Sequence, residues 1–401
     1  MFLSEQSLSA TKCIYMDYAA GRPIEPRAIE EMLPFLKLRY GNPSSLHLFG
    51  QQAKRAVEEA RSRVAALINA EKKESILFTS GATESNNLAI KGVANRNKDR
   101  GTRILTSSVE HMSVVNPCKY LTTKGFEALF LPVDKYGFLN LESLQKELTD
   151  KTILVSVVYA NPEIGTIEPI KEISKIVHGK NAYLHVDATA ACGQVAIDVK
   201  NEGIDLLTIS SNDMYGPRGA GALYVKDGVR LEPLLHGGGQ ERGLRSGTEN
   251  VAGIVGFGKA AQIAKKEMQT ESARLTKLRD RLIDGLLKPI PYSFLNGHPT
   301  TRLPDNVSVR YSFIEGESML LSLDMMGVYA STGSACAAKT LEPSHVLLAI
   351  GLKHEEAHGS LMFTLGSHNT EEDVDYAASL LPSIVKRLRD MSPLTPKELK
   401  G

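Results

Sequence analysis

The sequence has few cysteines and no excess of charge of either sign. Its four cysteines, Cys13, Cys118, Cys192 and Cys336, are widely separated and contain no Cys-x-x-Cys pair. This pattern excludes a disulfide framework and a cysteine-rich zinc site, and it favours a reducing cytoplasm. The formal net charge is only +1. We therefore expect neither nucleic acid nor an anionic membrane as a partner.

Long apolar segments are also missing. No run approaches the ~20 apolar residues that a membrane-spanning helix needs, and the first 12 residues are too polar for a signal peptide. What the chain does have is length: 401 residues, of which 42% are hydrophobic. That length can bury a large core divided between two or three domains or subdomains.

Short β-rich runs alternate with helical patterns between about residues 75 and 225. Continuous apolar strands separated by helices predict an α/β fold with a seven-stranded, mostly parallel sheet between helices. In such sheets the functional site lies beyond the carboxyl ends of the strands. The predicted strands are Ile76–Thr79, Ile104–Thr106, Leu129–Leu131, Ile153–Tyr159, Leu184–Val186, Leu206–Ile209 and Ala220–Val225.

The pattern changes after about residue 250. A long helical stretch from Val251 to about Leu287 is followed by short strands and helices, which predicts a smaller α+β domain. We therefore predict a large cofactor-type α/β domain over residues 15–250 and a small domain over 251–401. The N-terminal segment, about residues 1–30, is expected to pack on the small domain, which carries Cys336.

Polar motifs follow three of the predicted strands, and each has two interpretations. Ala82 and Thr83 lie where a strand meets a helix, so backbone N–H groups there could bind a phosphate; an ordinary helix cap is the alternative. Asp187 could hold a pyridinium nitrogen protonated, or it could cap the next helix. His111 could lie flat on an aromatic cofactor ring, or it could be a satisfied histidine at a strand end.

Cys336 differs from the other cysteines in its surroundings. Small residues and glycine surround it in Ala330-Ser-Thr-Gly-Ser-Ala-Cys-Ala-Ala-Lys339. An exposed loop of this kind makes a thiol accessible and oxidisable. Cys336 is therefore the cysteine that we expect to be functional.

Taken in order, these motifs resemble those of cysteine desulfurases of the NifS/IscS type, in the class V aminotransferase group of fold-type I pyridoxal-phosphate enzymes. The resemblance runs from about Tyr15 to Met391. The matching motifs are Asp17-Tyr-Ala-Ala20, Gly41-Asn-Pro-Ser-Ser45, Ser80-Gly-Ala-Thr-Glu84, Glu110-His111, His185-Val-Asp-Ala-Thr189, Gly237-Gly-Gly-Gln-Glu-Arg-Gly-Leu-Arg-Ser-Gly-Thr248, Glu315-Gly-Glu-Ser318 and Gly333-Ser-Ala-Cys336.

The resemblance implies a role for each matching residue. Ala82 and Thr83 correspond to the phosphate-binding turn, His111 to the histidine stacked on the ring, and Asp187 to the partner of the pyridinium nitrogen. Ser210 corresponds to a phosphate contact, and Thr248 to a phosphate contact supplied by the neighbouring subunit of a homodimer. Cys336 corresponds to the loop cysteine that takes sulfur from the substrate as a persulfide and delivers it to a scaffold protein.

Several positions depart from the family's pattern. Where the family has the lysine that binds the cofactor aldehyde, this chain has Asp213. A carboxylate cannot form an imine. The family's preceding histidine is replaced by Asn212, and its arginine that holds the substrate carboxylate is replaced by Met362. Two contacts to the cofactor are replaced by Pro162 and Ala190.

These departures predict an iron–sulfur cluster assembly protein without the family's standard pyridoxal-phosphate-dependent desulfurase activity. In this interpretation an IscS-like homodimer docks an IscU-type scaffold, and Cys336 serves as a cluster ligand or sulfur relay. An iron–sulfur cluster shared with the scaffold is then the expected cofactor, while pyridoxal phosphate is expected to be absent or only non-covalently bound. One alternative is an active pyridoxal-phosphate-dependent cysteine desulfurase using a different lysine, such as Lys339. A structural or regulatory dimer partner is the second alternative.

Overall fold

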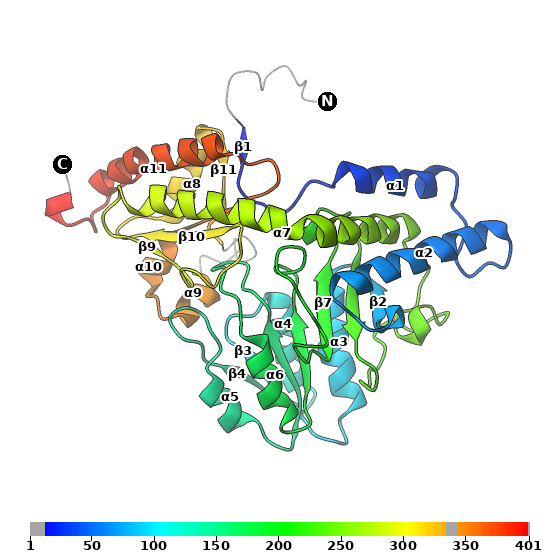
Figure 1. The fold of residues 1–401 in the computed structure, drawn as a ribbon. Helices are drawn as coiled ribbons and strands as arrows, with labels where there is room; N and C mark the ends of the chain where they lie inside the picture. Colours follow the sequence, from blue (N-terminus) through cyan, green and yellow to red (C-terminus); the bar gives the residue numbers. More distant parts are fainter. Residues whose placement is uncertain (1–12, 334–342, 400–401) are drawn as a thin grey trace.

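The computed structural model describes residues 13–333 and 343–399. Its largest element is a seven-stranded sheet in the lower half of Figure 1. This arrangement confirms the predicted α/β fold class. In spatial order the strands are β2 (Ile76–Thr79), β8 (Gly221–Val225), β7 (Leu206–Ser210), β6 (Tyr183–Asp187), β5 (Thr152–Val158), β3 (Arg103–Ser107) and β4 (Glu127–Leu131).

The sheet is parallel from β7 to β4, and only β8 runs against its neighbours β2 and β7. Successive residues along the central strands point to opposite faces of the sheet. Leu154 and Leu206 pack in one apolar cluster, whereas Val155 and Leu207 pack in another. Since side chains alternate across a strand, both faces of the sheet are covered, which explains why these strands are apolar throughout.

Helices cover the two faces. On one face lie α3 (Ala82–Arg96) and α4 (Met112–Thr122), which contribute to one apolar cluster. The other face is covered by α2 (Leu48–Leu67), α5 (Leu141–Glu147), α6 (Ile170–His178) and the first half of α7 (Val251–Leu287). The preceding helix α1 (Pro26–Lys37) lies along α7 (Figure 1). The contact of α2 with α7 is very close: a Cβ added at Gly258 would lie 2.5 Å from the Cα of Ala60.

A second, smaller core lies beside the large one. It is centred on an antiparallel sheet in which β10 (Asn306–Tyr311) lies between β9 (Ser293–Leu295) and β12 (Ser360–Thr364). The second half of α7, α8 (Gly316–Met325) and α11 (Glu371–Met391) pack on it. Short elements complete this part: β1 (Ile14–Tyr15) paired with β11 (Val328–Tyr329), α9 (His345–Ala349) and α10 (His354–His358).

Helix α7 belongs to both cores. Phe257 packs in the large core, whereas Leu278 and Leu282 pack in the small one. The predicted boundary at residue 250 falls just before this helix, and Ile14 of the N-terminal segment packs in the small core. The exact domain limits stay a prediction.

In the part of the chain that the structure describes, no helix combines the length and the apolar character that crossing a membrane requires.

Candidate functional site

A cavity of about 160 Å³ lies beyond the carboxyl ends of the parallel strands. Val158 ends β5, Asp187 ends β6, and Asp213 follows β7 by three residues. Residues at the ends of the large sheet line the cavity together with residues at the ends of the small sheet, among them Ala82, His111, Asp187, Asp213, Arg22 and Asp305. Its position is the one that parallel α/β sheets use for ligands. The fold therefore brings together three residues predicted from sequence: Ala82, His111 and Asp187.

The N-terminus of α3 forms one wall of this cavity. The N-cap residue of the helix is Gly81, with φ 149°. Because glycine has no side chain, this residue makes no side-chain capping hydrogen bond. Thr83 lies inside the first turn rather than at the cap, so the alternative interpretation of Thr83 as the helix cap is wrong. The first N–H groups of a helix and its dipole together favour an anion. This end of the cavity can hold a phosphate.

Asp187 is buried and receives hydrogen bonds on both of its carboxylate oxygens. Asn86 donates from Nδ2 to Oδ2 at 2.7 Å, and Thr189 donates to Oδ1 from its backbone N at 3.0 Å and from Oγ1 at 2.5 Å. The same Asn86 amide donates to Ser113 Oγ at 2.8 Å. Ser113 Oγ in turn lies 2.8 Å from His111 Nδ1. Asp187 and His111 are thus joined through two residues that sequence reasoning missed.

Asp213 lines the cavity within a short 3₁₀ turn, Asn212–Met214. Burial raises the pKa of its carboxyl group, while the charge of Arg22 and a hydrogen bond from Ser210 oppose that change. Arg22 is itself buried and pairs with Asp305 at 2.9 Å. Ser210, the predicted phosphate contact, ends β7 and bonds the Asp213 carboxyl group in this structure.

A larger cavity of about 670 Å³ adjoins the first, and His111 and Pro162 line both. Its walls include Met362, which has no charge to offer a substrate carboxylate, and the buried carboxyl group of Glu163. Cys336 lies outside the described residues. Gly333 and Pro343, which flank that part of the chain, both line the larger cavity.

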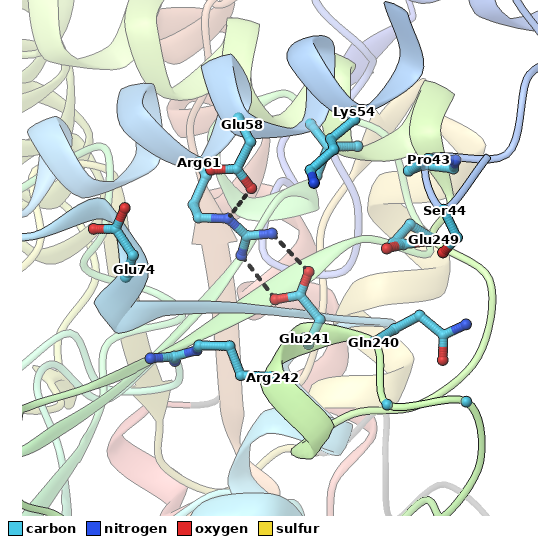
Figure 2. Close-up of a pocket in the computed structure, with 13 residues that line it drawn as sticks. Pro43, Ser44, Lys54, Glu58, Arg61, Glu74, Gln240, Glu241, Arg242 and Glu249 are labelled. Atoms are coloured by element: carbon cyan, nitrogen blue, oxygen red, sulfur yellow. Dashed lines mark hydrogen bonds and ion pairs between the residues drawn. The ribbon is translucent and has the colours of Figure 1, made fainter. Parts of the chain in front are cut away.

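The segment Gly237–Thr248 lies elsewhere, beside a third cavity of about 390 Å³ (Figure 2). Arg61 of α2 holds it through two hydrogen bonds of 2.7 Å to the carboxylate of Glu241. Glu241 and Arg242 both have positive φ angles, 47° and 59°. Thr248 is exposed and does not line the 160 Å³ cavity. Its predicted contact with a neighbouring subunit's phosphate stays a prediction.

Metal ligands do not gather anywhere in residues 13–333 and 343–399. No group of three or more histidine, cysteine, aspartate or glutamate side chains there could hold a metal ion. The predicted cluster ligand, Cys336, falls outside these residues.

Comparison with known proteins gives the family. The family described as aminotransferase class V matches residues 14–377. The chain is 60% identical to "Cysteine desulfurase IscS 1" of Archaeoglobus fulgidus, over 95% of this chain and 99% of that protein. It is 52% identical to "Cysteine desulfurase IscS" of Methanosarcina thermophila, over 99% of this chain and 98% of that one.

Solved structures agree with these relatives. A structure titled "NIFS-LIKE PROTEIN" has a TM-score of 0.88 and 37% identity, covering 94% of this chain and 100% of its own. Another, titled "SspA in complex with cysteine", has a TM-score of 0.78 and 33% identity, covering 89% of this chain and 100% of its own.

These relatives correct two predictions. The prediction of a cluster assembly protein without pyridoxal-phosphate chemistry is wrong, because relatives at 52–60% identity are named cysteine desulfurases. The prediction of a shared iron–sulfur cluster in place of pyridoxal phosphate is wrong for the same reason. Both predictions gave the departures from the family's pattern, above all Asp213 and Met362, more weight than the cavity, which keeps the α3 terminus, His111 and Asp187 together. From its sequence and its fold, the chain belongs to the class V aminotransferases and, among them, to the cysteine desulfurase IscS family.

Proposed function

We propose that the chain is a pyridoxal-phosphate-dependent cysteine desulfurase. It converts L-cysteine to L-alanine, and the sulfur atom passes to the Cys336 thiol to form a persulfide. The observation that carries this proposal is the cavity at the strand ends, which combines an uncapped helix N-terminus, His111 and a buried Asp187. The names of the relatives support the same reaction.

The described residues fit the cofactor at four points. The N-terminus of α3, at Ala82 and Thr83, would take the phosphate. Asp187, fixed by Asn86 and Thr189, would hold the pyridinium nitrogen protonated. His111 would lie against the ring, and Ser210 would add a phosphate contact. When bound, pyridoxal phosphate acts as an electron sink for the amino acid substrate.

The covalent attachment is where this chain departs from the family. We propose that Asp213 has replaced the usual lysine and that the amine comes from a different lysine. None of the described residues that line the 160 Å³ cavity is a lysine. Lys339, close in sequence to Cys336, is the candidate, and it lies outside the described residues. Borohydride reduction followed by peptide mapping would identify the lysine that carries the cofactor.

We further propose a cytoplasmic homodimer that delivers its persulfide sulfur to an IscU-type scaffold. Large apolar side chains between α1 and α2 are exposed, most of all Leu46 at 90% and Tyr40 at 75%. The third cavity joins this region to the Gly237–Thr248 segment, because Pro43 and Ser44 line it together with Gly238–Arg242. An apolar surface of this kind next to Thr248 is suited to a second copy of the chain.

Incubation of the purified dimer with pyridoxal phosphate and L-cysteine under nitrogen tests the proposal. We expect alanine to form, and we expect Cys336→Ser to abolish sulfur transfer while the protein stays folded. A protein that binds the cofactor but makes no alanine would contradict the proposal.

A further inference from the structure

A chain of hydrogen bonds runs from Asp187 through Asn86 and Ser113 to His111, and the donor of each bond can be assigned. Asp187 accepts on both oxygens: Thr189 donates to Oδ1, and Asn86 Nδ2 donates to Oδ2. Because a carboxylate oxygen can only accept, the group that faces Oδ2 is the Asn86 amide nitrogen, not its oxygen. Asn86 is fully buried, and its Oδ1 has no hydrogen-bond partner in the part of the chain that the structure describes. A flipped amide would put that oxygen against a carboxylate, so the orientation of Asn86 is set by Asp187.

The second N–H of the Asn86 amide then fixes the Ser113 hydroxyl group. It donates to Ser113 Oγ at 2.8 Å, which makes that oxygen an acceptor on this side. The hydroxyl proton is left to point at His111 Nδ1, also 2.8 Å away. Ser113 is 7% exposed, so little water competes for these bonds.

His111 Nδ1 receives a second donor at the same atom. The backbone N–H of Ser113 lies 3.1 Å from Nδ1, and a backbone N–H can only donate. Two donors on Nδ1 leave no place for a proton there, so the neutral ring carries its proton on Nε2.

We propose that Asn86 and Ser113 are positioning residues that hold His111 in the Nε2–H tautomer, with the direction of the bonds set by Asp187. His111 lines both the 160 Å³ and the 670 Å³ cavities. Its ring therefore offers an N–H donor at Nε2. The use of that donor beside a cofactor ring rests on the proposed function; the tautomer itself does not.

The tautomer can be read directly in cofactor-free dimer labelled with ¹⁵N at histidine. Long-range ¹H–¹⁵N correlation spectra distinguish Nδ1–H from Nε2–H rings, and a His111→Gln variant assigns the signal among the 10 histidines. We expect His111 to be in the Nε2–H form. Ser113→Ala removes one donor to Nδ1 and should lower the ratio of Nε2–H to Nδ1–H by about tenfold, the usual effect of one hydrogen bond.

Asn86→Asp tests the direction of the bonds. A carboxylate at this position would accept the Ser113 hydroxyl proton, so the ratio should fall at least as far as in Ser113→Ala. Asn87→Asp is the matched control, because it adds the same charge on the same helix to a side chain that bonds Thr83 O instead. It should leave the ratio unchanged.

Three results would overturn the proposal: an Nδ1–H ring in the unmodified protein, an unchanged ratio in Ser113→Ala, or equal effects of Asn86→Asp and Asn87→Asp. Ser113→Ala keeps the test open if Asn86→Asp does not fold. Since no cofactor is present, a failed desulfurase assay would leave this result standing, and the reverse also holds.

Discussion

Three buried glutamates have carboxyl pKa values far above the usual range. Burial raises the pKa of Glu110, Glu163 and Glu168 to about 8 each. Glu163 keeps one contact, a hydrogen bond of 2.7 Å from Ser344 Oγ, which opposes the change. Its other oxygen, Oε1, is buried and has no hydrogen-bond partner among residues 13–333 and 343–399.

The Glu163 carboxyl group should make stability depend on pH. Between about pH 4.5 and 8 the folded chain keeps this proton and the unfolded chain does not. The folded state then binds more protons, so the free energy of unfolding falls as pH rises. In the unmodified protein, this proton lowers the free energy of unfolding by at most about 5 kcal/mol between these pH values. We expect that decrease to be absent in Glu163→Gln. Denaturant melts at both ends of the range measure it.

The exposed Glu355 provides the control for this measurement. Glu355→Gln should leave the pH dependence of unfolding as it is in the unmodified protein. A Glu163→Gln variant whose stability falls with pH as steeply as the unmodified protein's would show that Glu163 is ionised in the folded chain.

Asp213→Lys should restore an amine inside the 160 Å³ cavity. We expect the variant to bind pyridoxal phosphate covalently at the substituted position, because the α3 terminus, His111 and Asp187 surround that point. Peptide mapping after borohydride reduction measures this, with Asp213→Asn as the uncharged control. Attachment of the cofactor to some other lysine in Asp213→Lys would mean that residue 213 does not face the cofactor aldehyde.

Sequence reasoning found single residues where a local signal existed. Asp187 and His111 could be predicted because each follows an apolar strand. Asn86 and Ser113 could not, because their contacts join residues 27 and 101 positions apart. Asn86 sits in a helix where its type also suits ordinary cap chemistry. Nothing local in the sequence distinguishes a cap from a buried donor to a distant carboxylate.

Between elements, the Arg61–Glu241 ion pair links the Gly237–Thr248 segment to helix α2 (Figure 2). Both residues are less than 10% exposed. Arg61 also bonds the carbonyl oxygen of Ile76 and lies over the ring of Phe78. Removal of one member of such a pair leaves a buried charge without its partner.

We expect Arg61→Ala to lower the free energy of unfolding by roughly 3–5 kcal/mol, the usual cost of breaking a buried ion pair. Arg27→Ala is the matched control: Arg27 also pairs with glutamates, but its side chain is 47% exposed. Its loss should cost under about 1 kcal/mol. Equal losses in the two variants, measured by chemical denaturation, would mean that burial does not strengthen the Arg61 pair.

Elements with a strong repeating pattern were predicted well. Helix α7 has the limits that its pattern indicates, Val251–Leu287, and all seven strands of the main sheet were found to within two residues at either end. The 3₁₀ turns at Asn212–Met214 and Glu241–Gly243 were not predicted. Tyr215, Glu241 and Arg242, in or next to these turns, have positive φ angles. Glycine and asparagine are the residue types that usually indicate such angles in a sequence, and neither occupies these positions.

At the scale of the whole molecule, the exposed apolar side chains between α1 and α2 should be covered by a second copy. We expect the protein to have twice the 43.7 kDa mass of one chain in light scattering. Leu46→Asp should shift it toward the monomer. Leu321→Asp, on α8, is the control because Leu321 is also exposed, at 65%, but lies on the small core. A monomer at micromolar concentration would contradict the proposed dimer.

The whole chain also explains why the first functional prediction was wrong. The motifs identified the family correctly, yet the departures at Asp213, Asn212, Met362, Pro162 and Ala190 were taken to decide the activity. The cavity is lined by residues at the ends of both sheets and retains its other polar groups. Relatives named desulfurases are 52–60% identical to the chain. These few positions carry less weight than a site assembled from many residues.

A single turnover with L-cysteine on the dimer loaded with pyridoxal phosphate tests the proposed desulfurase reaction. Alanine in solution and persulfide on Cys336 are counted in the same sample by mass spectrometry. The proposed reaction predicts equal amounts of the two, because each carbon–sulfur bond broken delivers one sulfur atom to one thiol. Cysteine recovered unchanged, with no alanine and an unmodified Cys336, would contradict it.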